Sequence, residues 1–166
     1  MRMGASPLVS ANVAVASRWL TSHDRTRPVS SSLGVGRPSG SKHVNRMKDL
    51  PRTLTTPSGV DLGPVTSVAD GASRSIVLVT RSSRFHGFVV RRGNALYGYV
   101  DRCPHAGLPL AQALDQFIAA DGRHIQCSWH GALFEPDTGL CVGGPCVGAH
   151  LQPWPLKTID GHIFTA

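Results

Sequence analysis

Two short segments of the 166-residue chain each place a cysteine and a histidine close together. The first reads "CPH" over residues 103–105 and the second reads "CSWH" over residues 127–130, with 21 residues between them. Burying a core does not require such pairs, whereas two thiolates and two imidazoles suit a zinc ion, an iron–sulfur cluster or copper. The sequence therefore predicts a metal centre whose ligands are Cys103, His105, Cys127 and His130.

The spacing of the ligands favours a two-iron cluster over zinc. Paired zinc ligands are usually separated by about two to four residues, but only one residue separates Cys103 from His105. If both cysteines bind one iron and both histidines bind the other, each loop has to span two metals, which fits one thiolate and one imidazole per loop. Gly107 and Gly131 give the loops the freedom to bend. Zinc in the same ligands remains open as the alternative.

Two further cysteines and the four other histidines of residues 61–166 need an interpretation. A four-cysteine cluster that used Cys141 and Cys146 would leave both paired histidines without a role. We therefore expect Cys141 and Cys146 to be buried structural residues. The remaining histidines near or within the expected domain are predicted to be ordinary surface or core residues; they are His86, His124, His150 and His162.

Charge divides the chain into a basic leader and a nearly neutral domain. Residues 1–60 hold nine Lys and Arg against two acidic residues, whereas residues 61–166 hold eight of each. The formal net charge of +7 thus belongs to the leader, and no aromatic residues are interleaved with basic ones, so we expect no nucleic-acid partner. No apolar run is long enough to span a membrane. We expect residues 1–60 to be disordered and residues 61–166 to form one domain.

The leader itself has three interpretations. Its Arg- and Ser-rich, acid-poor composition is typical of a transit peptide, and its apolar run 7–16 loosely imitates a secretory signal. The third interpretation, which we favour, is that translation starts at Met47. We expect a cytoplasmic protein, with an organelle matrix as the alternative if residues 1–46 are a transit peptide.

The pattern of the domain predicts a mainly β fold. Short β-branched and aromatic runs occur without strand–helix alternation, and Gly93-Asn94 reads as a tight hairpin turn. The segment 110–122 is predicted to contain a helical turn or two. The Cys/His pairs are expected on loops between strands, the second pair within a β-hairpin. The expected strands lie within residues 75–81, 85–92, 95–102, 124–130, 132–142, 154–159 and 162–166.

Residues 103–107 and 127–131, "CPHAG" and "CSWHG", resemble the two loops of a Rieske iron–sulfur domain, and the segment 143–145 resembles its proline-containing loop. The resemblance covers roughly residues 62–166. It implies one Rieske-type [2Fe-2S] cluster on a β-sandwich-like base with a smaller inserted cluster-binding subdomain. By the same resemblance, Cys103 and Cys127 ligate the buried iron, and His105 and His130 ligate the outer iron.

Departures from the family pattern predict a low reduction potential. High-potential members carry a loop disulfide at positions that correspond to Leu108 and Trp129, and hydroxyl donors at positions that correspond to Ala132 and Phe134. Hydrogen bonds to sulfur stabilise the reduced cluster, so their loss lowers the potential. Histidine ligation also implies a potential that falls as the pH rises. An apolar collar is expected from Leu108, Trp129, Leu133 and Pro145.

The expected function is one-electron transfer, as a ferredoxin-like component that connects a reductase with an oxygenase or another acceptor. One alternative is a small subunit of a redox complex of the nitrite-reductase kind, and another is a zinc-stabilised interaction module. We expect no independent enzyme, because no nucleophile–base pair or phosphate loop is present. A terminal Rieske oxygenase is not expected, because only 36 residues follow His130.

Overall fold

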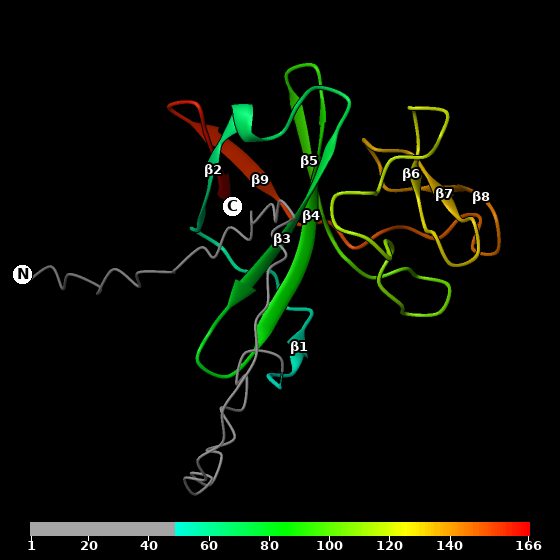
Figure 1. Ribbon diagram of the computed structural model, residues 1–166, viewed down its shortest axis with the longest axis horizontal. Coiled ribbons are helices and arrows are strands. Elements are labelled where there is room, and N and C mark those ends of the chain that lie inside the picture. The colour runs from blue at the N-terminus through cyan, green and yellow to red at the C-terminus, as the bar shows by residue number, and fades with distance from the viewer. Residues whose placement is uncertain (1–48) are drawn as a thin grey trace, which may run out of the picture.

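The structure, a computed structural model, describes residues 49–166 and consists of three small β-sheets (Figure 1). The central sheet is built around the long strand β4, which pairs with β3 along one side. The other side of β4 pairs with β5 and, beyond the end of β5, with the short parallel strand β1. The strands of this sheet are β1 (Arg52–Thr53), β3 (Ser73–Val79), β4 (Arg84–Arg92) and β5 (Ala95–Val100).

The two remaining sheets lie on opposite sides of the central one (Figure 1). One is antiparallel and consists of β2 (Asp61–Pro64), β10 (His162–Thr165) and β9 (Leu156–Ile159), with a short 3-10 turn at Val65–Ser67 after β2. The other consists of β6 (Ile125–Gln126), β7 (Leu133–Phe134) and β8 (Cys141–Gly143). Since the chain enters this third sheet after β5 and returns with β9, the third sheet and its loops form a subdomain inserted into the base. The prediction of a mainly β fold with an inserted subdomain is confirmed.

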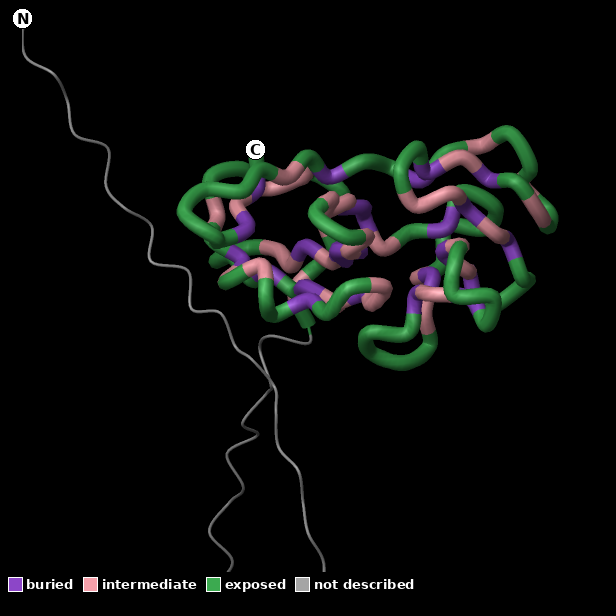
Figure 2. The backbone as a smooth tube through the Cα atoms, turned by 90° about the horizontal axis from the view of Figure 1, so that it is seen from above, coloured by how far each residue is buried: buried purple, intermediate pink, exposed green. Residues whose placement is uncertain are grey.

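Strand β4 supplies apolar side chains to two separate cores because its residues alternate between the faces of the sheet. Phe85 and Val89 belong to the core of the base, together with Trp154. Phe88 and Val90 belong to the core that lies under the inserted subdomain. Figure 2 shows buried segments in both bodies of the molecule. The central sheet therefore joins the base and the subdomain by contributing one face to each.

The hairpin between β4 and β5 has the turn that the sequence predicts. Arg92 is paired with Ala95, so Gly93 and Asn94 form a two-residue loop. Gly93 has a φ of 59°, a left-handed conformation that glycine adopts without steric cost. This turn fixes the register of β4 and β5.

Residues just before the predicted domain boundary at residue 61 are part of the described fold. Strand β1 pairs with the start of β4, the carbonyl of Pro57 accepts a hydrogen bond from Trp154 Nε1 at 3.2 Å, and the backbone amide of Gly59 donates to the carbonyl of Thr165 at 2.9 Å. The folded region therefore includes residues that the charge distribution assigned to the leader. Residues 1–48, and with them the transit-peptide and Met47 interpretations, lie outside the described residues.

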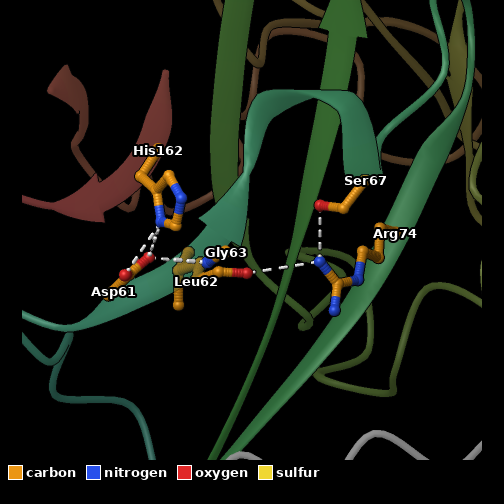
Figure 3. Close-up of polar contacts among 6 residues, drawn as sticks. All are labelled: Asp61, Leu62, Gly63, Ser67, Arg74 and His162. Atoms are coloured by element: carbon orange, nitrogen blue, oxygen red, sulfur yellow. Dashed lines mark hydrogen bonds and ion pairs between the residues drawn. The ribbon is translucent and has the colours of Figure 1, made fainter. Parts of the chain in front are cut away.

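Besides β1, which lies in the expected leader, the segment 110–122 and strand β2 differ from the sequence prediction. The segment 110–122 forms bends and turns instead of helical turns, and Asp115 within it has a φ of 63°, which a right-handed helix does not allow. Strand β2 was not predicted because its sequence, Asp-Leu-Gly-Pro, has little β propensity. Polar contacts hold it in place instead (Figure 3): Asp61 accepts from His162 Nδ1 at 3.0 Å, and Arg74 Nη1 donates to the carbonyl of Leu62 at 3.2 Å.

Among residues 49–166, no helix is long and apolar enough to cross a membrane.

Candidate metal centre

The first Cys/His pair lies on a tight loop that follows β5. The backbone amide of Cys103 donates to the carbonyl of Leu108 at 2.7 Å, and the amide of Gly107 donates back to the carbonyl of Cys103 at 2.8 Å. Gly107 has a φ of 71°, in the left-handed region. These contacts turn the chain within five residues and leave Cys103 buried and His105 exposed.

The second Cys/His pair lies on a loop of the same construction between β6 and β7. The amide of Cys127 donates to the carbonyl of Ala132 at 2.8 Å, and the amide of Gly131 donates to the carbonyl of Cys127 at 3.0 Å. Gly131 has a φ of 70°. In both loops the glycine follows the cysteine by four positions, although the histidines are spaced differently. The two loops therefore have the same backbone construction when they are aligned at the cysteine, and they differ in the position of the histidine.

The tertiary structure brings the two histidines together at the surface. The ring centroids of His105 and His130 are 4.9 Å apart, and the ring planes are inclined at 85° to each other. Both residues are exposed, whereas Cys103 and Cys127 are 2% and 1% exposed. The two imidazoles thus sit on the solvent side of the two thiols.

The two cysteines of the pairs also meet. Burial raises the pKa of the Cys127 thiol, and the neighbouring Cys103 thiol raises it further. The backbone N–H groups of Trp129 and His130 act in the opposite direction, because they donate toward the Cys127 sulfur. Such N–H groups stabilise negative charge on a ligating sulfur and on the reduced form of a cluster.

A network of hydrogen bonds ties the two loops to each other and to the base. The amide and the hydroxyl of Ser128 both donate to the carbonyl of Leu110, at 2.8 Å and 3.0 Å. The amide of Leu110 in turn donates to Asp101 Oδ1 at 2.8 Å, and Arg52 Nη2 from β1 donates to the carbonyl of Asp101 at 2.9 Å. Burial raises the pKa of Asp101, because it disfavours the charged carboxylate. The hydrogen bonds from Leu110 and Arg52 act in the opposite direction and offset part of that cost.

Sequence reasoning did not identify Asp101, Ser128 or Arg52 as members of the site. Asp101 and Ser128 lie next to the motifs, and a polar residue beside a ligand is the usual position for an outer-shell hydrogen-bond partner. Arg52 lies 51 positions before Cys103, the first residue of the first Cys/His pair. Its place in the site depends on the parallel pairing of β1 with β4, for which the sequence carries no local signal.

The proline-containing loop lies against the second ligand loop. A Cβ on Gly144 would come within 2.8 Å of the Ala132 Cα and within 3.1 Å of the Gly131 carbonyl oxygen. Glycine is therefore required at position 144, where its φ is 86°. The exposed Pro145 follows at the surface.

The apolar collar predicted around the site is partly at the surface. Leu108 is 37% exposed and Trp129 is 47% exposed, whereas Leu133 is half-buried below Gly143. Ala132 and Phe134 occupy the positions that correspond to the hydroxyl donors of high-potential members. Both residues are fully buried and apolar. The side of the site away from solvent is thus apolar, and the side with the histidines is rimmed by apolar side chains.

Cys141 is buried as predicted, but Cys146 is only half-buried. Their sulfur atoms are 3.2 Å apart. Two of the remaining histidines pair with neighbouring carboxylates, His124 with Asp121 at 2.6 Å and His162 with Asp61 at 3.0 Å. His86 has a buried Nε2 without a hydrogen-bond partner among residues 49–166, and His150 is exposed.

The donor set fits a [2Fe-2S] cluster with two different irons. The buried thiols of Cys103 and Cys127 could hold an iron inside the protein, and the exposed imidazoles of His105 and His130 could hold the outer one. The four side chains come from two loops of equal construction, each of which supplies one sulfur and one nitrogen. A cluster that also used Cys141 and Cys146 would not account for the approach of the two imidazoles.

Two known proteins are similar in sequence to part of this chain. The ferredoxin component of the p-cumate 2,3-dioxygenase system of Pseudomonas putida is 33% identical over 64 residues, which are 39% of this chain and 50% of that protein. Ferredoxin CarAc of Metapseudomonas resinovorans is 28% identical over 78 residues, 47% of this chain and 67% of that protein. The aligned part thus spans half to two thirds of these relatives.

A solved structure shares the fold. It is described as a complex of reduced oxygenase and oxidized ferredoxin in carbazole 1,9a-dioxygenase, and its matching chain has a TM-score of 0.51 and 24% identity. The match covers 64% of this chain and 91% of that one. At this level of identity the likeness shows that the two chains share a fold.

The model of the Rieske [2Fe-2S] domain family matches residues 58–159, more than half of the chain and all of both Cys/His loops. Membership in that family implies one Rieske-type [2Fe-2S] cluster and accounts for the paired loops, the buried thiols and the exposed imidazoles together. This protein belongs to the Rieske [2Fe-2S] domain family.

Proposed function

We propose that this protein is a Rieske-type ferredoxin that carries single electrons to an oxygenase and is not an enzyme by itself. The observation that carries the proposal is the pair of exposed imidazoles, with ring centroids 4.9 Å apart, above two buried thiols. When bound, the cluster supplies a one-electron redox couple. The relatives named above, the ferredoxin component of a dioxygenase system and a second ferredoxin, support the same function.

We propose Cys103, His105, Cys127 and His130 as the ligands. The buried apolar residues around Cys103 and Cys127 exclude water from the thiol side, and the backbone N–H groups of Trp129 and His130 stabilise the added charge there. The histidine side opens to solvent, so a redox partner that covers it comes within short range of the cluster. The hydrogen bonds from Ser128 to Leu110 keep the two loops at a fixed separation when the charge changes.

The partner would dock on the apolar rim around the two imidazoles. Leu108, Trp129 and Val147 are 37%, 47% and 67% exposed in three loops of the inserted subdomain. A rim of this kind supports a small and transient interface, which suits a carrier that has to bind a reductase and an oxygenase in turn. The cytoplasmic location expected from the sequence remains a prediction.

The test uses the full chain produced with its cluster. The sample is analysed for iron, sulfide and zinc, reduced with dithionite, examined by electron paramagnetic resonance and then oxidised with ferricytochrome c. We expect two irons and two sulfides per chain, a reduced signal typical of mixed Cys/His ligation, and one electron delivered per chain. Colourless protein with one zinc would overturn the proposal in favour of a structural metal clip.

Histidine variants test the ligand assignment. His130→Ala should lose most of the bound iron or the spectral signature of histidine ligation. His150→Ala removes an exposed histidine that follows β8 in the same subdomain and should keep both. Equal spectra for the two variants would contradict the assignment of His130.

A further inference from the structure

This inference rests on the proposed function and its ligand set. The two cysteines outside that set lie side by side. Cys141 opens β8, and Cys146 follows in the proline-containing loop. Their sulfur atoms are 3.2 Å apart, and the Cys141 thiol is also within 3.2 Å of the carbonyl of Gly143. Two thiols at this separation have to shorten the distance between their sulfurs to about 2.05 Å to form a disulfide.

The loop between the two cysteines is already closed by its backbone. The amide of Gly148 donates to the carbonyl of Cys141 at 2.9 Å, and the amide of Ala149 donates to the carbonyl of Cys146 at 2.9 Å. The ends of the loop are therefore held together without a covalent bond. Gly144, between the two cysteines, has a φ of 86°, and Gly148, two residues after Cys146, has a φ of 87°. Glycine has no Cβ to restrict the backbone, so these positions can adjust to a small sulfur movement.

The pair is reachable from solvent on one side and touches the metal centre on the other. Cys141 is 1% exposed, whereas Cys146 is half-buried. The same loop packs on the second ligand loop, where a Cβ on Gly144 would come within 2.8 Å of the Ala132 Cα. Oxidation of the pair would therefore alter the packing of this loop against the second Cys/His loop.

We propose that Cys141 and Cys146 are a redox-active dithiol that closes to a disulfide while the [2Fe-2S] cluster stays bound. The oxidant is a low-molecular-weight disulfide such as oxidised glutathione. The half-exposed Cys146 is the sulfur that an external disulfide reaches, and the buried Cys141 is the sulfur that resolves the product. Within residues 49–166, no other pair of sulfurs outside the proposed ligands is placed for this reaction.

The reaction balances as two successive exchanges. The Cys146 thiolate attacks one sulfur of oxidised glutathione, so that a Cys146–glutathione disulfide forms and one glutathione thiolate leaves. The Cys141 thiolate then attacks the Cys146 sulfur, forms the Cys141–Cys146 disulfide and releases the second glutathione. The two protein thiols are oxidised, one glutathione disulfide is reduced to two thiols, and each leaving thiolate takes up the proton that an attacking thiol has lost.

Closure is expected to be slow. Cys141 is 1% exposed and Cys146 is half-buried, so an external disulfide has only limited access to the pair. The test therefore has to be brought to equilibrium and cannot rely on a brief exposure to oxidant.

The experiment equilibrates the cluster-loaded full chain anaerobically in glutathione buffers that run from fully reduced to fully oxidised. Each sample is quenched in acid, denatured and alkylated. Cleavage before Asp137 and Asp160 releases a peptide that contains Cys141 and Cys146 but neither ligand cysteine. We expect this peptide to lose about 2 Da, without alkylation, in more than half of the molecules at the oxidised end. Iron and sulfide content, measured on the same samples, should stay unchanged.

Several results would overturn the proposal. They are two alkylated cysteines at the oxidised end, a lasting glutathione adduct on Cys146 without closure, and closure that occurs only as iron is lost. The variant Cys146→Ser, changed at the half-buried position, should keep its iron and should not show the lighter peptide. If Cys146→Ser lost its iron, Cys146 would be a ligand and the proposal would be wrong. The peptide readout does not depend on the cluster, so an untreated sample without iron would instead count against the proposed function.

Discussion

At the scale of single residues, the two Cys/His loops depend on a glycine four positions after each cysteine. Gly107 and Gly131 both take a left-handed conformation and return a hydrogen bond to the carbonyl of their cysteine. A Cβ on Gly131 would have no heavy atom within 4 Å. The requirement for glycine there is therefore one of backbone conformation and not of space.

This conclusion predicts an order among substitutions at Gly131. Gly131→Ala should destabilise the loop by about 1–2 kcal/mol, because an L-residue with a side chain is strained at positive φ. Gly131→Asn should cost less, because asparagine adopts this region more readily. The measurements are the thermal midpoint and the iron retained after gel filtration. Equal losses for Ala and Asn would show that another factor governs the position.

At the scale of elements, β4 contributes side chains to two cores. On the side of β4 that faces the base, the neighbouring rings leave no room for a residue larger than Gly87. A Cβ on Gly87 would come within 2.6 Å of the Trp154 ring and within 2.8 Å of the Phe85 ring. The rings of Phe85 and Trp154 pack edge to face, with centroids 4.6 Å apart. Both rings are buried, so neither can move aside without disturbing the core of the base.

Gly87→Ala should therefore lower the free energy of unfolding by about 1–3 kcal/mol, the usual cost of overpacking a core. Gly143→Ala is the matched control, since its Cβ would lie at an ordinary distance of 3.5 Å from Leu133 and its φ is not left-handed. The comparison is made by thermal unfolding followed by circular dichroism. If Gly87→Ala unfolded at the same temperature as Gly143→Ala, the crowding at Trp154 would be relieved by movement that the structure does not show.

At the scale of the whole molecule, a few polar residues line a cavity at the boundary between the central sheet and the inserted subdomain. His86 from β4, Arg52 from β1 and Asp101 after β5 all line one cavity of about 270 Å³ between the central sheet and the segment 109–117. Burial, with the nearby charges of Arg52 and Arg84, lowers the pKa of His86 to about 4. His86 is thus neutral in the folded protein at neutral pH.

The lowered pKa predicts a loss of stability in mild acid. Between pH 6.5 and about pH 4 the unfolded chain binds a proton at His86 that the folded protein does not bind, so stability falls as the pH is lowered through this window. Below about pH 4 His86 is protonated in both states, so the loss of stability has reached its full value and no longer changes with pH. Because His86 is only partly buried, the effect should be on the order of 1 kcal/mol.

The variant His86→Gln keeps a polar side chain and removes the titration. Thermal midpoints of the wild type and the variant, measured at pH 7 and at pH 4.5, should differ in their pH dependence, with a smaller fall for the variant. Parallel pH profiles would assign the acid sensitivity to other groups.

Local patterns predicted much of the fold because strands and tight turns are short-range features. Strands β3, β4 and β5 fall within or beside the apolar runs that predicted them, and Gly93-Asn94 marks their hairpin. The prediction of helical turns in 110–122 was wrong, because apolar residues there are placed by contacts with the central sheet; for example, Phe117 stacks on Phe88 with ring centroids 4.0 Å apart. Periodicity cannot reveal a contact between residues so far apart.

The sequence by itself determined the chemistry of this protein, because residue type and spacing decide which metals a pair of loops can hold. It identified the four candidate ligands, the mainly β class and the family that the comparisons then established. Tertiary structure decided what spacing could not: the burial of the thiols, the approach of the two imidazoles, and the contact between Cys141 and Cys146. These depend on how β1, the central sheet and the inserted loops pack, and packing between distant segments leaves no local pattern in a single sequence.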